Sequence, residues 1–123
     1  MKGRASALLP PLLYMGLIFF LSAQSSFPFV PSGFWSFDKL IHGCEYAVLG
    51  FLVARALSML GAPFAFALAV AISALYGVSD EVHQAFVPRR SSEVLDAVAD
   101  ACGSLSGAGA WQLLARVFHK PPA

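Results

Sequence analysis

The side chains that could do chemistry gather in three short segments of this chain. They are Asp38, Lys39, His42, Glu45, Asp80, Glu81, His83, Gln84, Arg89, Arg90, Asp96 and Asp100. Carboxylates and imidazoles can act as general acids or bases, and basic side chains can hold a phosphate group. Such a set could also hold Mg²⁺ or Mn²⁺, but nothing in the spacing demands a metal. We therefore predict no metal site and assign no cofactor.

Helical periodicity would place most of these side chains on three faces, because residues three or four apart lie on one side of a helix. The first face carries Asp38, His42, Glu45 and, at its edge, Tyr46. The second carries Tyr76, Asp80, His83 and Gln84. The third carries Asp96 and Asp100, continued by Gly103 and Gly107. Small residues four apart let helix backbones approach closely, so the third face is expected to turn toward the other helices.

The composition is typical of a membrane protein. Hydrophobic residues make up 58% of the 123 residues and charged residues 12%, whereas soluble domains carry about 25% charged residues. The length allows one domain, 1–123, and not two independent cores. A net charge of +1 argues against general nucleic-acid binding, which needs a concentrated basic face.

Four segments are long enough to cross a bilayer as helices. They run over about residues 5–21, 38–59, 64–87 and 93–118. The fourth is the weakest by hydropathy, because two aspartates interrupt its first half. Pro10 and Pro11 are expected in the early turns of the first helix, where a missing backbone donor costs least. A tight turn is predicted at Gly61-Ala62-Pro63. The sequence thus predicts an all-α integral membrane bundle of four transmembrane helices.

Two features have competing interpretations. The first span resembles a cleaved signal peptide in length, but Leu21-Ser22-Ala23 is a poor cleavage site and favours a retained helix. Cys44 and Cys102 lie in apolar stretches without CxxC spacing. We expect two buried free thiols rather than a disulfide, and no thiolate metal site.

The basic residues indicate the orientation. One membrane side has no acidic residue and holds Lys2, Arg4, Arg55, Arg116 and Lys120. Basic residues beside membrane spans stay in the cytoplasm, so both termini are predicted to be cytoplasmic. All seven acidic residues then lie in the outer half. A charge at mid-membrane costs about 2.5–3.5 kcal/mol on insertion scales, so these side chains should face one another or a water-filled pocket.

Four segments, in order, resemble the motifs of VanZ-like membrane proteins. Leu21-Ser22-Ala23-Gln24 is similar to the end of the family's first helix, and the segment from Asp38 to Tyr46 is similar to D-K-x-x-H-x-x-x-Y. The stretch from Tyr76 to Ser91 resembles Y-G-x-x-D-E-x-x-Q-x-F-x-P-G-R-S. Arg89 stands where that pattern has Gly, and the spacing favours Arg90 as the family arginine. The last motif, D-x-x-A-D/N-x-x-G, corresponds to Asp96, Ala99, Asp100 and Gly103.

The resemblance implies a multi-pass protein of the bacterial inner membrane with a role in the cell envelope. The family is named for raised tolerance to teicoplanin, a glycopeptide that binds cell-wall precursors. No particular reaction is implied, and whether the protein is an enzyme stays open. We expect an outward-facing polar pocket that binds or modifies an anionic lipid or a lipid-linked envelope precursor.

The candidate residues divide into two roles. The candidate catalytic acids or bases are His42, Asp80 and Glu81. The candidate substrate-binding residues are Asp38, Lys39, Tyr46, Gln84, Arg89, Arg90, Asp96 and Asp100. Two other interpretations stay open: a non-enzymatic envelope factor with a structural polar cluster, and a small proton-linked carrier. The carrier is least favoured, because no pair of broken helices occurs in matching halves of the chain.

Overall fold

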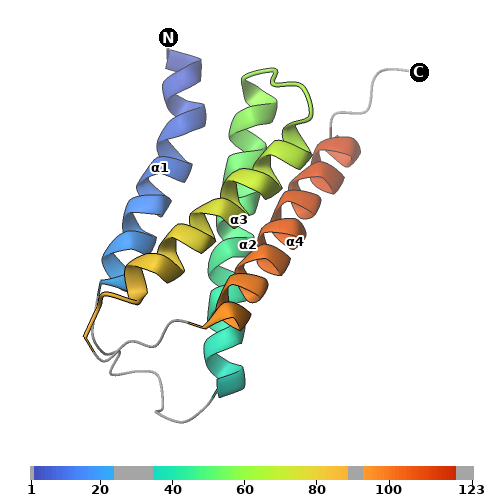
Figure 1. Ribbon diagram of the computed structural model, residues 1–123. Coiled ribbons are helices and arrows are strands. Elements are labelled where there is room, and N and C mark those ends of the chain that lie inside the picture. Colours follow the sequence, from blue (N-terminus) through green and yellow to red (C-terminus); the bar gives the residue numbers. More distant parts are fainter. Residues whose placement is uncertain (1, 24–34, 89–92, 119–123) are drawn as a thin grey trace.

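The computed structural model is an all-α bundle, and it describes residues 2–23, 35–88 and 93–118. Its helices are α1 (Lys2–Ser22), α2 (Trp35–Met59), α3 (Ala65–Gln84) and α4 (Val94–Phe118). These described ranges contain no strand, so the predicted all-α class is confirmed. The helices alternate in direction, and the start of α1 and the end of α4 lie at one end of the bundle (Figure 1). We call this the terminal end, and the opposite end the acidic end.

The bundle has the exterior of a membrane protein. Three segments are long and apolar enough to cross a membrane: Gly3–Ser22, Lys39–Met59 and Ala65–Gln84. α4 is not among them, because two aspartates and a series of glycines and serines lower its hydropathy. Its outer side is nevertheless apolar, since Leu105, Leu113 and Val117 are each more than half exposed on the bundle surface. Large apolar side chains on the outside suit lipid better than water.

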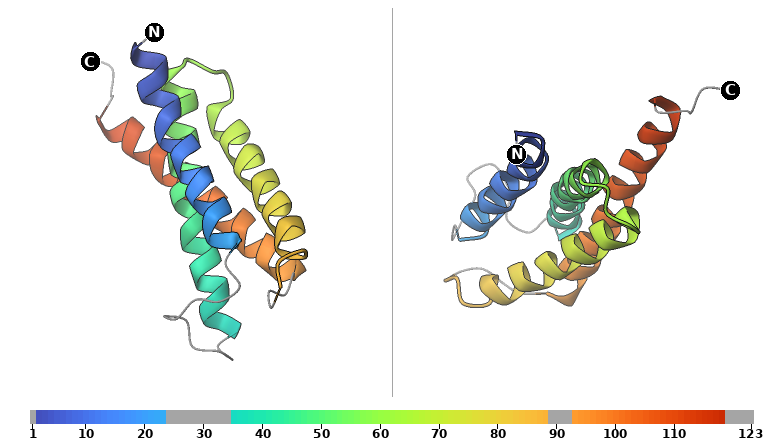
Figure 2. Two further views of the ribbon diagram at one scale, coloured as in Figure 1. Left: turned by 90° about the vertical axis from the view of Figure 1, so that its left-hand side faces the viewer. Right: turned by 90° about the horizontal axis from the view of Figure 1, so that it is seen from above.

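α2 and α4 pack backbone against backbone (Figure 2). A Cβ atom on Gly103 would overlap the backbone of Gly43, and one on Gly107 would overlap the backbone of Ala47. Because neither glycine of α4 has a side chain, the two helices approach as closely as small residues four apart permit. The prediction that this face of α4 turns toward the bundle is confirmed, since both glycines are buried.

The turn between α2 and α3 reverses the chain at the terminal end. Gly61 has φ of 71°, in the left-handed region that glycine adopts without steric cost. Its N–H donates to the carbonyl of Ser58 at 3.1 Å, and the N–H of Ala62 donates to the carbonyl of Leu57 at 2.9 Å. These two bonds form a Schellman motif, which ends a helix by satisfying its last carbonyls. The predicted tight turn is therefore confirmed.

Two tyrosine hydroxyls attach α1 to the bundle. Tyr14 of α1 donates to the carbonyl of Glu45 on α2 at 2.9 Å. Tyr76 of α3 donates to the carbonyl of Met15 on α1 at 2.6 Å. Ile18 of α1 is fully buried in the apolar core beside these contacts. α1 is thus positioned against both α2 and α3, and its last turn reaches the acidic end.

The predicted helix limits need three corrections, one of which is that α2 begins at Trp35 and not at residue 38. α1 begins at Lys2, so Pro10 and Pro11 lie in its interior and not in its early turns. Each proline removes one backbone hydrogen bond from the middle of the helix. α3 ends at Gln84, before the predicted limit of residue 87. The turn that follows leads to Pro88, and the residue before a proline disfavours helical geometry.

The two cysteines are free, but their predicted burial is wrong. Cys44 and Cys102 are both exposed on the outside of the bundle. The neighbouring Gly43 and Gly103 face the contact between α2 and α4. Each cysteine, one position away from its glycine, is therefore rotated toward the outer edge of that contact. An apolar environment along the chain did not distinguish a surface that suits lipid from a protein core.

Candidate functional site

The acidic end contains a buried polar cluster built from all four helices. Seven of the predicted site residues are at most 6% exposed there: His42, Tyr46, Asp80, Glu81, Gln84, Asp96 and Asp100. Tyr46, one helical turn after His42, is fully buried. Burying a charge is costly unless it is paired or hydrogen-bonded. The contacts within the cluster therefore decide what it can do.

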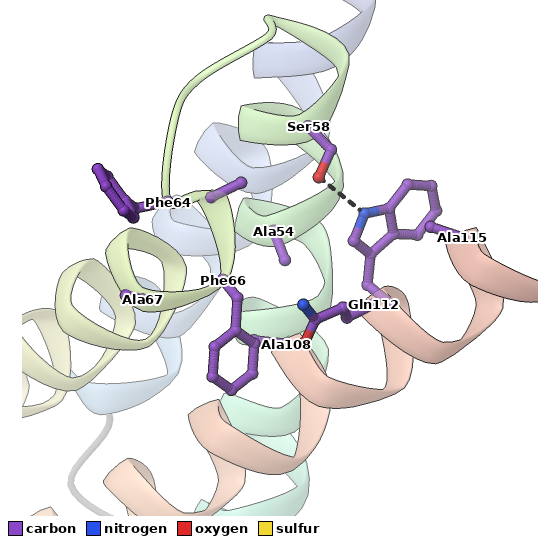
Figure 3. Close-up of a pocket in the computed structure, with 10 residues that line it drawn as sticks. Ala54, Ser58, Phe64, Phe66, Ala67, Ala108, Gln112 and Ala115 are labelled. Atoms are coloured by element: carbon purple, nitrogen blue, oxygen red, sulfur yellow. Dashed lines mark hydrogen bonds between the residues drawn. The ribbon is translucent and has the colours of Figure 1, made fainter. Parts of the chain in front are cut away.

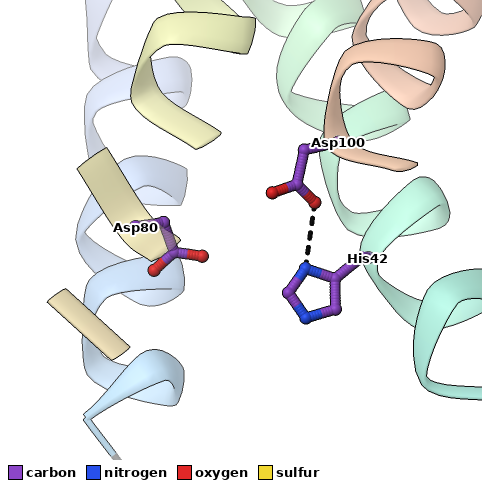
Figure 4. Close-up of side chains that lie close together, drawn as sticks. All are labelled: His42, Asp80 and Asp100. Carbon is purple, nitrogen blue, oxygen red and sulfur yellow. Dashed lines mark hydrogen bonds and ion pairs between the residues drawn. The ribbon is translucent and has the colours of Figure 1, made fainter. Parts of the chain in front are cut away.

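His42 and Asp100 form the central pair of the cluster (Figure 4). Nδ1 of His42 on α2 lies 2.9 Å from Oδ1 of Asp100 on α4. A neutral imidazole protonated at Nδ1 donates this hydrogen bond and keeps Nε2 as an acceptor. Nε2 lies 4.0 Å from Oδ2 of Asp96, one helical turn before Asp100. The two ring nitrogens of His42 thus face two different carboxylates of α4.

Lys39 neutralises the outer part of the cluster. Its ammonium group donates to Oε2 of Glu93 at 2.8 Å and makes a second, very short contact with Oδ1 of Asp96. Only 14% of the Lys39 side chain is exposed. The ion pairs join the beginning of α2 to Asp96 in the first turn of α4 and to Glu93, the residue just before that helix. Lys39 therefore compensates carboxylates of α4 in this structure.

Asp80 belongs to a second hydrogen-bonded group, which reaches α1. The hydroxyl of Ser22, at the end of α1, donates to Oδ1 of Asp80 in a short contact. The side-chain amide of Gln84 donates to the same hydroxyl at 3.5 Å. A single serine thus connects Gln84 and Asp80, which are spaced i and i+4 on α3. Through this contact the last turn of α1 becomes part of the cluster.

Several buried oxygens have no hydrogen-bond partner among the residues that the structure describes. They include Oδ2 of Asp80, Oδ2 of Asp100 and the hydroxyl of Tyr46. An unpaired buried polar group costs about 1–3 kcal/mol, and more if it is charged. Asp80 on α3 faces His42 and Asp100 across one space between the helices (Figure 4). These three oxygens therefore lie in one cluster, although Ser73 Oγ and His83 Nδ1, outside it, are also buried without a hydrogen-bond partner among the described residues.

Gly77 lets α3 approach this space. A Cβ atom at Gly77 would lie 2.9 Å from Cβ of Asp100, 3.1 Å from its Oδ2 and 3.3 Å from Cε1 of Tyr46. The first of these distances is shorter than side chains tolerate. Gly77 therefore sets the separation between α3 and the partnerless oxygen of Asp100.

The cluster offers two sets of possible metal ligands, both containing His42. In one set His42 is joined by Asp80 and Asp100, and in the other by Glu81 and Asp96. Within each set one ligand atom per residue lies within 4.8 Å of the others. The second set is already engaged, because Lys39 binds Asp96 and Oε2 of Glu81 accepts the backbone N–H of Glu93 at 3.1 Å. The sequence predicted no metal site, and that prediction stays untested.

Some residues that share a predicted face lie elsewhere. Tyr76 donates to α1, and His83 stacks on Phe19 of α1 with ring centroids 4.5 Å apart. Glu45 is partly buried beside α1, where its carbonyl accepts the Tyr14 hydroxyl. Helical spacing groups these three residues with the cluster. In the structure, however, each of them contacts α1 instead.

Three residues of the cluster were not among the predicted site residues. Ser22 binds Asp80, Glu93 binds Lys39, and Gly77 gives room to Asp100. Each lay within or beside a motif that was already recognised. Ser22 is in the segment similar to the end of the family's first helix, and Gly77 is in the Y-G-x-x-D-E motif. Glu93 lies three residues before Asp96, which places it on the same helical face.

Some predicted site residues lie outside the parts of the chain that the structure describes. Arg89 and Arg90 are not among the described residues, and the same holds for Gln24 and Lys120. Asp38 is part of α2, but its side chain is not described. The predicted roles of Asp38, Arg89 and Arg90 in binding substrate therefore stay predictions.

Two apolar grooves open on the bundle surface beside the cluster. One, of about 440 Å³, lies between α1 and α2 and is lined by residues that include Tyr14, Leu21 and Leu40. The other, of about 330 Å³, lies between α2 and α4 and has Lys39 and Leu40 among its lining residues. Both therefore reach the first turns of α2, where Lys39 pairs with α4.

A separate pocket lies toward the terminal end. It has a volume of about 430 Å³ and is formed by α2, α3 and α4 (Figure 3). Alanines and Phe66 make up much of its wall, and Trp111 donates its indole N–H to Ser58 at 3.0 Å. It contains no acidic or basic side chain. Among the described residues, the chemistry-bearing side chains thus gather at the acidic end and not in this pocket.

Fold and site together define a class: a small multi-pass membrane protein whose helices bury an acidic cluster with one histidine at one end. The family model described as VanZ/LLP1 matches residues 7–115, which reach into all four helices. The chain belongs to the VanZ/LLP1 family, and the resemblance seen in its motifs is confirmed. Neither the curated proteins nor the solved structures gave a significant match.

Proposed function

We propose that this protein binds the anionic head group of an envelope lipid or a lipid-linked precursor at its acidic end, in the bacterial cytoplasmic membrane. The observation that carries the proposal is the presence of buried oxygens of Asp80 and Asp100 without a partner among the described residues. A purely structural network would be stabilised by satisfying them, because each unpaired buried group destabilises the fold. Carboxylate oxygens accept hydrogen bonds, so the hydroxyl or amino groups of a head group would complete the network, while basic side chains must hold its phosphate.

The surroundings favour a lipid as that ligand. The cluster lies at one end of helices that are long and apolar enough to cross a membrane, which places it near the level of lipid head groups. The two grooves that meet at Leu40 have apolar walls, as the hydrocarbon chains of a lipid require. Lys39 lines one of these grooves but is already paired with Glu93 and Asp96, so most of the positive charge for a phosphate is expected from Arg89 and Arg90.

The cluster also has groups for acid–base chemistry on a bound head group. Asp100 orients His42 through Nδ1, and in an imidazole held in this way Nε2 is the proton acceptor, which lies 4.0 Å from Oδ2 of Asp96. Asp80 and Glu81 are the candidate acids on α3. We propose binding as the primary activity and modification of the head group as its extension. Sequestration or alteration of a lipid-linked precursor would then account for a contribution to glycopeptide tolerance.

Lipid retention by variants tests the proposal. The protein is purified in mild detergent, and the co-purified lipids are quantified by mass spectrometry. Lys39→Gln and Arg90→Gln each remove one cation at the acidic end, and we expect each to reduce the retained phosphate-bearing lipid at least about five-fold. Gln112→Ala is the matched control, because Gln112 lines the pocket toward the terminal end. Circular dichroism and size-exclusion chromatography confirm that each variant is folded.

Two results would count against the proposal. Equal lipid retention by the wild-type protein and both charge variants would show that the acidic end does not hold the head group. Absence of any enriched anionic lipid in the wild-type protein would have the same meaning. Either result would favour the non-enzymatic envelope factor, in which the cluster holds the helices together.

A further inference from the structure

We infer that His42, Asp80 and Asp100 form a binding site for one divalent metal cation. The three residues come from three different helices, α2, α3 and α4. One ligand atom from each lies within 4.8 Å of the others. Ligands bound at about 2.0–2.2 Å from a metal lie at most about 4.4 Å apart. Small side-chain movements are therefore enough to bring all three onto one ion.

The second observation that points to a cation is the state of the two aspartates. Oδ1 of Asp80 accepts from Ser22, and Oδ1 of Asp100 faces His42, so each carboxylate is already oriented by one oxygen. Oδ2 of each is buried, with no partner in the part of the chain that the structure describes. Asp100 is fully buried and Asp80 is 5% exposed. Each aspartate thus presents one oriented oxygen for a ligand, as metal sites require.

Repulsion between the two aspartates is the reason why a bound cation would stabilise the cluster. Two carboxylates that share a buried space repel each other, and the described permanent cation nearest to them, Lys39, is held by Glu93 and Asp96. A bound cation between Asp80 and Asp100 would offset this repulsion directly.

The geometry favours this set over the one containing Glu81 and Asp96. The ammonium group of Lys39 contacts Asp96, and a second positive charge at that carboxylate would be repelled. Oε2 of Glu81 accepts the backbone N–H of Glu93. Asp96 is therefore already paired with a cation. Asp80 and Asp100 retain the oxygens that a metal needs.

The donor set indicates the kind of metal. One imidazole nitrogen with two carboxylates suits Mn²⁺ or Zn²⁺, whereas Ca²⁺ prefers six to eight oxygen ligands. Three protein ligands leave coordination positions open, as in catalytic rather than structural sites. The inference rests on the proposed function for what fills those positions: an anionic head group. The cation would supply the positive charge that a phosphate needs beside so many acids.

Binding of Mn²⁺ alone tests the site without any lipid. Purified protein in detergent is titrated with Mn²⁺ and the free ion is measured by electron paramagnetic resonance. We expect one ion per chain with a Kd below about 100 µM. Asp80→Asn and Asp100→Asn should each raise the Kd at least about ten-fold, because each removes a charged ligand and even substitutions of outer-shell partners weaken metal binding by about 10–100-fold. Glu45→Gln removes the same charge from α2 outside both ligand sets and should change the Kd less than about two-fold.

Further measurements distinguish binding at this site from nonspecific attraction of Mn²⁺ to acidic side chains. Electron spin echo spectra of the Mn²⁺ complex should show coupling to an imidazole ¹⁴N that is lost in His42→Gln. Mn²⁺ should raise the Tm of the wild-type protein, because it joins three helices of the folded state, and should leave that of Asp80→Asn unchanged. The inference is overturned if the wild-type protein binds no Mn²⁺, if the nitrogen coupling is absent, or if Glu81→Gln and Asp96→Asn weaken binding as much as Asp80→Asn and Asp100→Asn do.

Lipid retention separates this inference from the proposed function. If the cation holds the head group, Asp80→Asn and treatment with a chelator should both reduce lipid retention. If the head group binds without a cation, removing a negative charge by Asp80→Asn should leave retention equal or raise it, because repulsion falls. That result would overturn the link between metal and lipid and would keep the proposed function. Loss of lipid binding in Lys39→Gln together with intact Mn²⁺ binding would support both.

Discussion

Nδ1 of His42 lies 2.9 Å from Oδ1 of Asp100, and this contact joins the polar faces of α2 and α4 at the acidic end. The contact depends on how closely the two helices approach. That approach depends in turn on Gly103 and Gly107, which have no side chain where α4 meets the backbone of α2. The chemistry of the cluster and the packing of the bundle are therefore linked, and each can be tested by substitution.

Alanine at Gly107 should destabilise the bundle. Its Cβ atom would overlap the backbone of Ala47, which cannot move aside as a flexible side chain can. Overpacking of this kind costs typically about 1–3 kcal/mol. Gly16→Ala is the matched control, because a Cβ atom there meets nothing within 4 Å. Thermal unfolding in detergent should show a lower Tm for Gly107→Ala and an equal or higher one for Gly16→Ala. Equal stability of both variants would contradict the packing of α2 on α4.

Alanine at Gly77 should impair the site more than the fold. The added Cβ atom would lie 2.9 Å from Cβ of Asp100 and 3.1 Å from its Oδ2, so the carboxylate must move. We expect at least about a ten-fold weaker Kd for Mn²⁺, with a helical circular dichroism spectrum like that of the wild type. An unchanged Mn²⁺ affinity would show that the position of Asp100 Oδ2 does not matter for binding.

The ion pair of Lys39 and Asp96 should show strong coupling in a double-mutant cycle. Lys39→Met leaves the 2% exposed Asp96 without its cation. Breaking a buried pair from one side costs about 3–5 kcal/mol. Adding Asp96→Asn should recover much of this loss, because the remaining amide carries no charge. The free energy of unfolding is measured for all four proteins. Additive effects would mean that the two side chains do not compensate each other in the membrane.

Arg90→Lys and Glu81→Gln should abolish the envelope phenotype without preventing folding. Lysine keeps the charge of Arg90 but loses the bidentate fork that binds phosphate or carboxylate. Teicoplanin tolerance is measured in cells that express each variant at the wild-type level, with Gln112→Ala as the control. Full tolerance with both variants would favour the non-enzymatic interpretation and would contradict the predicted roles of Arg90 and Glu81.

A reporter fused after Ala123 tests the orientation. The end of α4 and the start of α1 lie at the terminal end (Figure 1), and Arg4, Arg55 and Arg116 belong to the ends of α1, α2 and α4 that lie there. Basic residues next to membrane spans remain in the cytoplasm, so a cytoplasmic reporter should be active. A reporter that is active only in the periplasm would reverse the orientation and place the acidic end in the cytoplasm.

Local properties of the sequence predicted much of this structure. Hydropathy and length located the helices to within a few residues, because each helix satisfies its backbone hydrogen bonds within its own segment. Spacing of three and four residues correctly grouped Asp96, Asp100, Gly103 and Gly107 on one buried face. The prolines of α1 were misplaced, because the apolar pattern begins after the helix does.

The sequence alone could not predict which side chains pair with each other between helices. Arg90, Lys39 and His42 were all possible partners for the acids, and only the approach of α2 to α4 assigns Lys39 to Asp96 and His42 to Asp100. Tyr76 and His83 share a face with Asp80 by spacing, yet α1 lies close enough to bind both. No metal was predicted, because the three proposed ligands belong to three helices and have no mutual spacing in the sequence.

By itself, the sequence determined that this chain forms apolar helices with acidic residues at one end and a membrane-protein family's motifs in order. These features follow from composition and local periodicity, which act within one helix at a time. The tertiary structure decided which oxygens are satisfied: Ser22 orients Asp80, His42 orients Asp100, and one oxygen of each aspartate is left toward the same space. That outcome depends on distances between helices, which glycine contacts and side-chain packing set only when the whole bundle assembles.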